Sequence, residues 1–212
     1  FVGINIMGIK TIVFIHTLCL IEMKIEILTE RTRIRLIELS DLDSIHKLHS
    51  LPEIDEYNTL GIPKSIEETK VVIEPWISEN KMNNIKNYTF AIESNLNNDF
   101  IGLFGLKLGH EKYKRGEVWY KIHSVHWNKG IATEVLSRMV NYGFDELKLH
   151  RIQAGAAVKN IGSIKVLEKV GFIKEGRGRQ ILPLKSGWSD NYEYSILETD
   201  ERKLSTTKPK LH

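Results

Sequence analysis

The stretch Trp127-Asn128-Lys129-Gly130-Ile131-Ala132-Thr133 stands between a run of strand-like residues and a run of helix-like residues. The residues before it, 116–123, are rich in β-branched and aromatic side chains, which favours a strand. After it, apolar residues recur at helical spacing from Ile131 to Phe144. The sequence therefore predicts that a strand passes into a helix through a short turn that contains Gly130.

A helix that begins at this turn can bind an anion. Its first backbone N–H groups have no acceptor inside the helix, and the helix dipole adds partial positive charge at the same end. Lys129 adds a full positive charge beside them. We interpret the turn as the binding site for the pyrophosphate of a nucleotide-containing cofactor. A purely structural role for Gly130 is the alternative.

The composition is typical of one globular domain with short appendages. The chain has 212 residues, of which 42% are hydrophobic and 27% are charged, and its net charge is +3. This small charge forms no basic stripe, so we expect no nucleic-acid binding. No apolar run is long enough to span a membrane. The single cysteine, Cys19, excludes an internal disulfide and fits a reducing cytoplasm.

We expect three parts along the chain. The segment from Thr11 to Ile21 is strongly apolar, but it lacks the small-residue cleavage site of a signal peptide. We interpret residues 1–22 as an apolar extension and Met23 as the first residue of the domain, and whether the extension is native stays open. The domain is expected over 23–199, followed by a basic polar tail over 200–212.

The remaining pattern predicts a mixed sheet with helices on both faces, in the order β-α-α-β-β-β-α-β-α-β-β. Helices are expected to begin at Ser40 and Ser65, after Gly130 and at Asn160. Pro75 predicts a kink or break near Glu74, and Gly171 predicts a left-handed end of the last helix. Strands are expected over 30–39, 88–93, 100–108, 116–123, 151–158, 172–183 and 190–197, and the second and third should form an antiparallel hairpin.

This order, with a glycine turn after the fourth strand, resembles the GNAT superfamily of acetyl-CoA-dependent N-acetyltransferases, and the local sequences resemble its RimJ/RimL branch. The resemblance covers nearly all of 27–197. It implies an α/β fold with a mostly antiparallel central sheet, splayed between the fourth and fifth strands. It rests on the turn and on Leu28-Thr29-Glu30-Arg31 leading to Arg35-Leu36 and Asp41, on His150-Arg151-Ile152, on Asn160 to Phe172, and on Gly187-Trp188-Ser189-Asp190 with Tyr192 and Tyr194.

The resemblance implies acetyl-CoA as cosubstrate. Trp127 stands where many relatives have Arg or Gln, so backbone amides of the turn would bind the pyrophosphate, and the pantetheine arm would lie between the splayed strands. The implied contacts are the amides of Asn128, Lys129, Gly130, Ile131 and Ala132, helped by Thr133, then the backbone of Ile122, His123 and Ser124 along the arm, and the side chain of Asn160, which is also a plain helix cap.

Transfer of an acetyl group to an amine needs a base for the amine and an acid for the leaving thiolate. Glu117 matches an acidic residue that the family places near the acceptor amine, and it is the first candidate base. The tyrosine that many relatives use as acid is Leu167 here, so the role shifts to Ser163, which matches a serine suggested for it in the RimL type. A backbone amide near Ile122 would polarise the thioester carbonyl. The alternative for Glu117 is a solvated side chain without a catalytic role. The alternative for Ser163 is an ordinary residue of the first helical turn.

The resemblance implies direct attack in a ternary complex on a primary amine, foremost a protein N-terminus. A small acceptor such as an antibiotic, polyamine or amino acid, and a non-catalytic acyl-CoA-binding module, are the alternatives. A homodimer is left open. We expect no metal site, because four histidines have spacings that fit no common zinc motif: His110, His123, His126 and His150.

Overall fold

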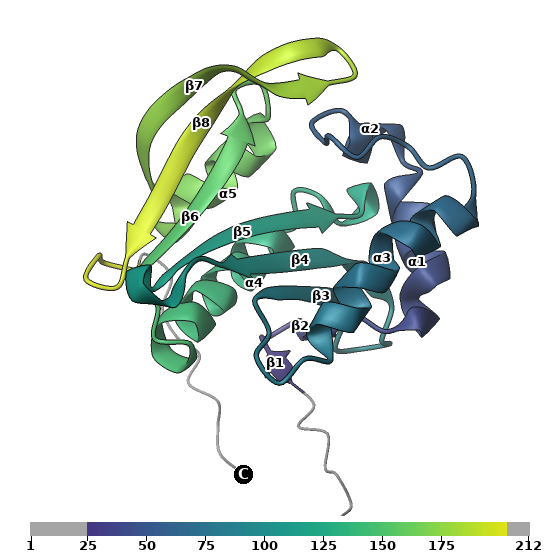
Figure 1. The fold of residues 1–212 in the computed structure, drawn as a ribbon, viewed down its shortest axis with the longest axis horizontal. Coiled ribbons are helices and arrows are strands. Elements are labelled where there is room, and N and C mark those ends of the chain that lie inside the picture. The colour runs from purple at the N-terminus through teal and green to yellow at the C-terminus, as the bar shows by residue number, and fades with distance from the viewer. Residues whose placement is uncertain (1–24, 203–212) are drawn as a thin grey trace, which may run out of the picture.

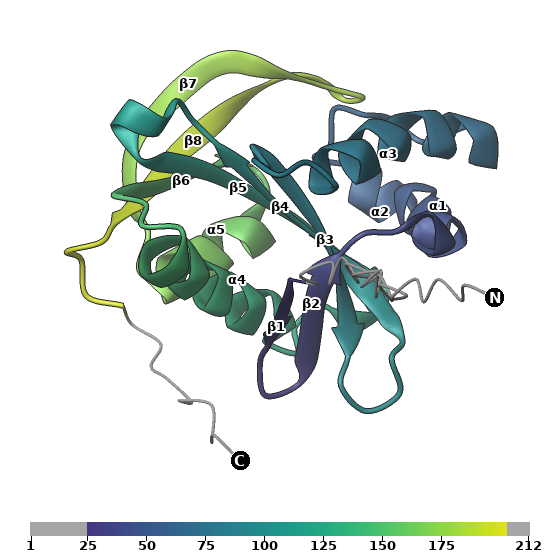
Figure 2. The same ribbon diagram turned by 60° about the horizontal axis from the view of Figure 1, so that its bottom comes forward.

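The computed structural model describes residues 25–202, which build one eight-stranded sheet with helices on both of its faces (Figures 1 and 2). The strand order is β1-β2-β3-β4-β5-β6-β8-β7, and every neighbouring pair is antiparallel except β5 and β6. The expected mixed, mostly antiparallel sheet is confirmed. The apolar extension over 1–22, Cys19, Met23 and most of the basic tail lie outside the described residues.

The described strands and helices follow the predicted order with a few additions. The strands are β1 (Glu26–Leu28), β2 (Thr32–Leu36), β3 (Asn87–Ser94), β4 (Phe100–Leu108), β5 (Arg115–Ile122), β6 (Arg151–Ala157), β7 (Ile173–Leu184) and β8 (Gly187–Leu197). The helices are α1 (Leu42–His49), α2 (Pro52–Asp55), α3 (Ile66–Asn80), α4 (Ile131–Asn141) and α5 (Ile161–Val170), with short turns η1 (Leu39–Asp41), η2 (Glu111–Tyr113), η3 (Ser124–His126) and the π-helical η4 (Tyr142–Glu146).

Three expectations about helix ends are confirmed. The Ser65 hydroxyl accepts the backbone N–H of Glu68 at the start of α3, and Asn160 Oδ1 accepts the N–H of Ser163 at the start of α5, 3.1 Å away. Gly171 ends α5 with a φ of 110°, a left-handed conformation that favours glycine. These ends are determined by local side-chain chemistry, which a sequence shows directly.

The expected N-cap at Ser40 was wrong, and of the kink or break expected near Glu74, the break does not occur. Ser40 is not an N-cap, because Asp41 Oδ2 accepts the N–H of Glu38 and the chain enters α1 through the short turn η1. The helix α3 is not broken at Pro75 but continues to Asn80. Pro75 and Val71, whose carbonyl loses its helical partner, are both exposed, so water can satisfy that carbonyl.

The first predicted strand was too long at both ends, and a separate strand that precedes it, β1, was not predicted. Residues 29–32 form a tight turn, in which the Thr29 N–H donates to the Thr32 carbonyl over 2.8 Å, so that β1 and β2 form a hairpin. This turn contains neither Gly nor Pro, the residues that most often mark a turn in a sequence. The four-residue α2 also went unpredicted, and β8 begins earlier than expected, at Gly187.

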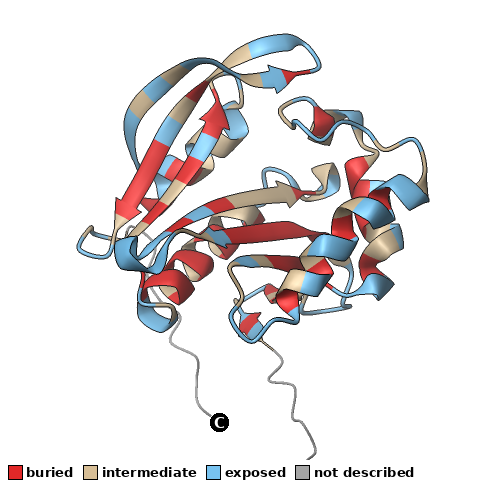
Figure 3. Cartoon of the chain, viewed as in Figure 1, coloured by how far each residue is buried: buried red, intermediate tan, exposed pale blue. Residues whose placement is uncertain are grey.

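The central strands separate two apolar layers, and Figure 3 shows β4 buried along most of its length. Val118 and Ile122 of β5 pack in the larger core, which also contains residues of α4 and α5. Trp119 packs in the smaller core with residues of α1 and α3. Even-numbered side chains of β5 therefore face α4 and α5, and odd-numbered ones face the opposite side.

The sheet opens between β5 and β6, the fourth and fifth of the predicted strands. Their parallel pairing is limited to three positions, Arg115 with Arg151, Gly116 with Ile152 and Glu117 with Gln153. Beyond Glu117 the two strands diverge, as Figure 1 shows, while each stays paired with its other neighbour. The expected splay is confirmed, and it leaves edge backbone groups of two central strands facing a gap.

Candidate active site

The turn before α4 contains two residues with left-handed backbone conformations. Asn128 and Gly130 both adopt left-handed conformations, with φ of 58° and 77°. Gly130 is also the N-cap of α4, and glycine offers no side-chain acceptor to the first-turn amides. The turn can therefore hold an anion on backbone donors, with the positive charge of Lys129 at the same turn.

Arg31 contacts this turn from the β1–β2 hairpin. Its Nη1 donates to the carbonyl of Lys129 over 2.8 Å, and its Nε donates to Glu134 Oε2 over 2.6 Å. Its backbone N–H donates to Glu134 Oε1 over 2.9 Å. The sequence showed Arg31 only as part of a family-like segment, because nothing local relates it to a turn 98 residues away.

The segment between β5 and the turn is braced by its own hydrogen bonds. The Trp127 indole N–H donates to the Ile122 carbonyl, and the Ser124 carbonyl accepts the Trp127 backbone N–H. The His123 backbone N–H donates across the sheet to Ile101, 2.9 Å away. Because backbone groups alternate along an antiparallel pair, the backbone of Ile122, but not the N–H of His123, faces the gap between β5 and β6.

Two of the residues assigned from sequence lie at the start of α5. The Asn160 side chain caps the helix, and the Ser163 carbonyl accepts the hydroxyl of Tyr120, 3.4 Å away. Burial raises the pKa of Tyr120 to about 12, so its hydroxyl stays protonated at neutral pH. Leu167, which replaces the tyrosine of many relatives, is 1% exposed in the core. Ser163 thus lies on the α4/α5 side of the sheet.

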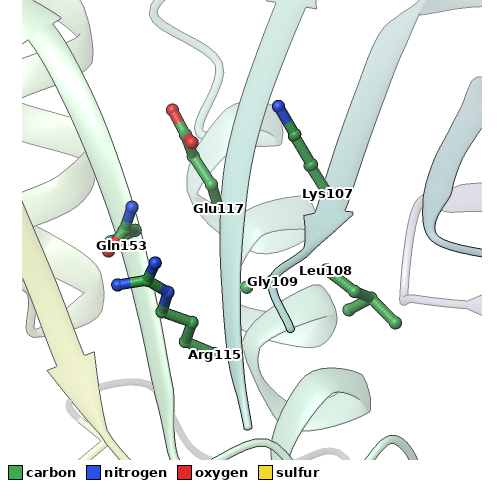
Figure 4. Close-up of a pocket in the computed structure, with 7 residues that line it drawn as sticks. Lys107, Leu108, Gly109, Arg115, Glu117 and Gln153 are labelled. Atoms are coloured by element: carbon green, nitrogen blue, oxygen red, sulfur yellow. The ribbon is translucent and has the colours of Figure 1, made fainter. Parts of the chain in front are cut away.

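Glu117 lies on the other side, in a shallow pocket of about 190 Å³ at the last paired position before the splay. Figure 4 shows its side chain beside that of Lys107, its cross-strand partner, with Arg115 and Gln153 nearby. The pocket combines one carboxylate with two cationic side chains. It is lined by Lys107, Leu108, Gly109, Arg115, Gly116, Glu117 and Gln153.

Lys121 follows Glu117 on the same side of β5, and its surroundings were missed in the sequence. Its Nζ lies 3.4 Å from His49 Nε2 and 6.0 Å from the Trp119 ring centre. Burial lowers the pKa of Lys121 to about 8, although the charge of Asp55 acts in the opposite direction. Burial, together with the charge of Lys121, lowers the pKa of His49 to about 3. A neutral imidazole therefore faces a half-buried amine on this side of the sheet.

The four histidines noted in the sequence do not converge. His150 Nδ1 lies 2.9 Å from Glu198 Oε1, and the rings of His123 and His126 are 6.4 Å apart. Across residues 25–202, no three His, Cys, Asp or Glu side chains gather as a metal-binding group. Within the same residues, no helix has the length and apolar character that crossing a membrane requires.

Comparison with known proteins agrees with this geometry. The family described as the acetyltransferase (GNAT) domain matches residues 31–173. The chain belongs to the GNAT acetyltransferase family. An uncharacterized N-acetyltransferase p20 of Bacillus licheniformis is 30% identical over 172 residues, which cover 81% of this chain and 96% of that protein. The uncharacterized N-acetyltransferase YoaA of Bacillus subtilis is 32% identical over 173 residues, 82% of this chain and 97% of that protein.

Solved structures give the same result. A GNAT-family acetyltransferase from Bacillus anthracis superposes with a TM-score of 0.73 at 28% identity, over 83% of this chain and all of that one. Spermidine N-acetyltransferase from Vibrio cholerae, solved with CoA and spermine, gives a TM-score of 0.69 at 26% identity, over 78% of this chain and 95% of that one. The GNAT fold and the membership among N-acetyltransferases, both assigned by resemblance, are confirmed.

Proposed function

We propose that this GNAT enzyme transfers the acetyl group of acetyl-CoA to the α-amine of a protein N-terminus, as expected for the RimJ/RimL branch, by direct attack in a ternary complex. Three features support it: the amide-lined turn, the gap beside β5, and the charges around Glu117. A cytoplasmic location fits this activity and is part of the proposal.

The turn and the gap fit CoA. The pyrophosphate would be bound by the amides of Asn128, Lys129, Gly130, Ile131 and Ala132, with the Thr133 hydroxyl beside them. The pantetheine arm would lie in the gap along the end of β5, near Ile122, His123 and Ser124, with Asn160 on its other side. The bound cosubstrate supplies a thioester, whose carbonyl carbon the acceptor amine attacks.

The acceptor reaches the gap from the side of Glu117. The pyrophosphate turn and α5 lie on the side of the sheet that carries α4, so an arm in the gap leaves its far end accessible from the opposite side. There Glu117, directly or through a water molecule, takes a proton from the acceptor ammonium. The nitrogen then bonds to the acetyl carbon as the carbon–sulfur bond breaks.

The leaving thiolate needs a proton from the other side of the gap. Ser163 lies there, in the first turn of α5, and donates its hydroxyl proton to the sulfur before solvent returns one to the serine. The nitrogen loses its second proton when the amide forms, so the overall reaction releases one proton. Placing the base and the acid on opposite sides of the sheet separates the two proton transfers.

The choice of a peptide amine as the proposed acceptor rests on the charges around the Glu117 pocket. Lys107 and Arg115 line the pocket beside Glu117, and Lys121 follows on the same side of β5. An acceptor with several positive charges would be repelled by these cations, whereas an N-terminal amine adds a single charge. This balance favours a peptide α-amine over a polyamine.

A small polyamine acceptor is the second candidate. The spermidine N(1)-acetyltransferase of Vibrio cholerae is 29% identical over 143 residues, 68% of this chain and 79% of that protein. Asp55 offers structural support for it: this carboxylate is 4% exposed, and its Oδ1 has no hydrogen-bond partner among the described residues. An ammonium group could satisfy that oxygen. The replacement of the family tyrosine by Leu167 is the observation behind a third candidate, a non-catalytic acyl-CoA-binding module.

Release of CoA thiol from acetyl-CoA tests the proposal. The acceptors are a peptide with a free N-terminus, the same peptide with a blocked N-terminus, and spermidine. We expect rapid thiol release with the free peptide, at least tenfold slower release with spermidine, and none above background with the blocked peptide. Faster release with spermidine would support the polyamine acceptor instead. CoA binding without turnover on any amine would support the non-catalytic module, and absence of CoA binding would overturn all three candidates.

A further inference from the structure

The backbone of Arg31 is held in place by hydrogen bonds of the β1–β2 hairpin. The hairpin that contains it is closed by the bond from the Thr29 N–H to the Thr32 carbonyl and by a 2.8 Å bond from the Thr32 N–H to Thr29 Oγ1. The Arg31 carbonyl accepts the N–H of Asn95 over 3.0 Å, and its own N–H donates to Glu134. Its backbone is therefore fixed on both sides, which lowers the entropy lost when its side chain is ordered.

The bond from Arg31 to the Lys129 carbonyl determines where the next amide points. That carbonyl and the Gly130 N–H belong to one trans peptide group, in which the two point in opposite directions. Because Arg31 Nη1 lies 2.8 Å from the carbonyl oxygen, the Gly130 N–H is turned away from Arg31. Gly130 has no side chain to restrain this peptide, so the arginine supplies the restraint.

Arg31 also neutralises an acidic group close to the anion site. Glu134 lies in the first turn of α4, where its charge would repel a pyrophosphate. Burial raises the pKa of Glu134, but hydrogen bonds from Thr29 and Arg31 outweigh burial and leave the pKa below its ordinary value. Glu134 is therefore ionised at neutral pH, and the Arg31 guanidinium at 2.6 Å offsets its charge.

We propose that Arg31 is a positioning residue of the cofactor site, which orients the Gly130 amide for the CoA pyrophosphate and cancels the charge of Glu134. The proposal rests on the proposed use of CoA. It makes the β1–β2 hairpin part of the cofactor site, although no hairpin residue needs to touch the cofactor. It also makes the effect of Arg31 specific to ligands that contain the pyrophosphate.

Calorimetric titration with CoA tests this role in Arg31→Gln, Arg31→Lys, Glu134→Gln and the double variant Arg31→Gln/Glu134→Gln. The matched control is Arg202→Gln, because Arg202 forms two 3.2 Å contacts with Asp145, beyond the C-terminal end of α4. We expect Arg31→Gln to raise the Kd for CoA at least tenfold and Arg202→Gln to change it less than twofold. Arg31→Lys should fall between, because an ammonium cannot reproduce the guanidinium contacts.

The double variant separates positioning from general destabilisation. Removing the Glu134 charge should recover at least threefold in CoA affinity relative to Arg31→Gln, although it removes another native contact. The kcat/KM for S-acetylpantetheine, which lacks the pyrophosphate, should change less than twofold in Arg31→Gln. Equal CoA affinity in Arg31→Gln and Arg202→Gln would overturn this inference alone, and a wild type that binds no CoA would overturn the proposed function as well.

Discussion

The indole Nε1 of Trp127 donates to the carbonyl of Ile122, 2.6 Å away. This bond joins the end of β5 to the turn before α4 and closes the short η3 segment between them. The resemblance noted in the sequence implies Arg or Gln at the position of Trp127 in many relatives. The indole therefore has a structural role, because its bond sets the spacing between the end of β5 and the turn, where we propose that the pantetheine arm and the pyrophosphate bind.

Replacing Trp127 with Phe should loosen this spacing. The variant loses the indole N–H and leaves the Ile122 carbonyl without that donor, at a cost of about 1 kcal/mol in unfolding free energy. CoA affinity should fall by about three- to tenfold, because a hydrogen bond of this size now has to be replaced by ordering of the loop. Urea denaturation and calorimetry measure the two effects. Unchanged CoA affinity together with lowered stability would restrict the indole to a folding role.

Glu117→Gln should lower turnover by about a hundredfold or more, as expected when a general base is lost. The Kd for CoA should stay within twofold, because Glu117 lies across the sheet from the turn that is proposed to bind the pyrophosphate. The turnover of this variant is compared with that of the control Glu111→Gln, which alters an exposed acidic residue in η2 outside the pocket. Turnover equal in the two variants would remove Glu117 as the base.

Gly130→Ala should affect both folding and CoA binding. Alanine at a φ of 77° is strained, and its Cβ would lie 3.5 Å from Arg31 Nη2. We expect a loss of about 1 to 2 kcal/mol in unfolding free energy. We also expect weaker CoA binding, because the turn relaxes away from the shape that directs its amides. Gly187→Ala, with a φ of 107° and nothing within 4 Å of the added carbon, is the control for strain alone.

The lowered pKa of Lys121 predicts that the stability of the fold depends on pH. Its pKa of about 8 lies below its ordinary value of 10.5, so between these values the folded protein binds fewer protons than the unfolded chain. The free energy of unfolding should therefore gain a contribution as pH rises from about 8 to 10.5. Below pH 8 the full cost of burying the charge remains.

Lys121→Met removes that cost and should stabilise the protein at pH 7 by about 1 to 3 kcal/mol, since one pKa unit corresponds to about 1.4 kcal/mol. The difference in unfolding free energy between wild type and variant should shrink as pH rises towards 10. Chemical denaturation at pH 7, 8.5 and 10 measures it. A difference that is constant with pH would show that the Lys121 charge is not buried in the folded state.

The features that the sequence predicted well depend on residues close together in the chain. The turn at Gly130, the cap at Asn160 and the left-handed end at Gly171 each follow from the chemistry of a few neighbouring positions. The splay between β5 and β6 followed from a family resemblance over most of the chain, and not from any one segment.

The missed features depend on contacts between distant segments. Arg31 meets Lys129 and Glu134 only because β2 lies near α4 in the folded sheet, and Lys121 meets His49 only because α1 packs over β5. The helix α3 continues through Pro75, because the helix-breaking tendency of proline is offset when the carbonyl that loses its hydrogen bond faces water. Exposure and long-range pairing are properties of the fold, so residue types and spacing did not reveal them.

A competition between two acceptors tests the proposed function most directly. The wild-type enzyme is incubated with acetyl-CoA and equal concentrations of a peptide with a free N-terminus and of spermidine, and both products are measured by mass spectrometry. We predict that the acetyl group appears on the α-amine of the peptide at least ten times as often as on spermidine. Acetylation of spermidine in preference to the peptide would contradict the proposed acceptor.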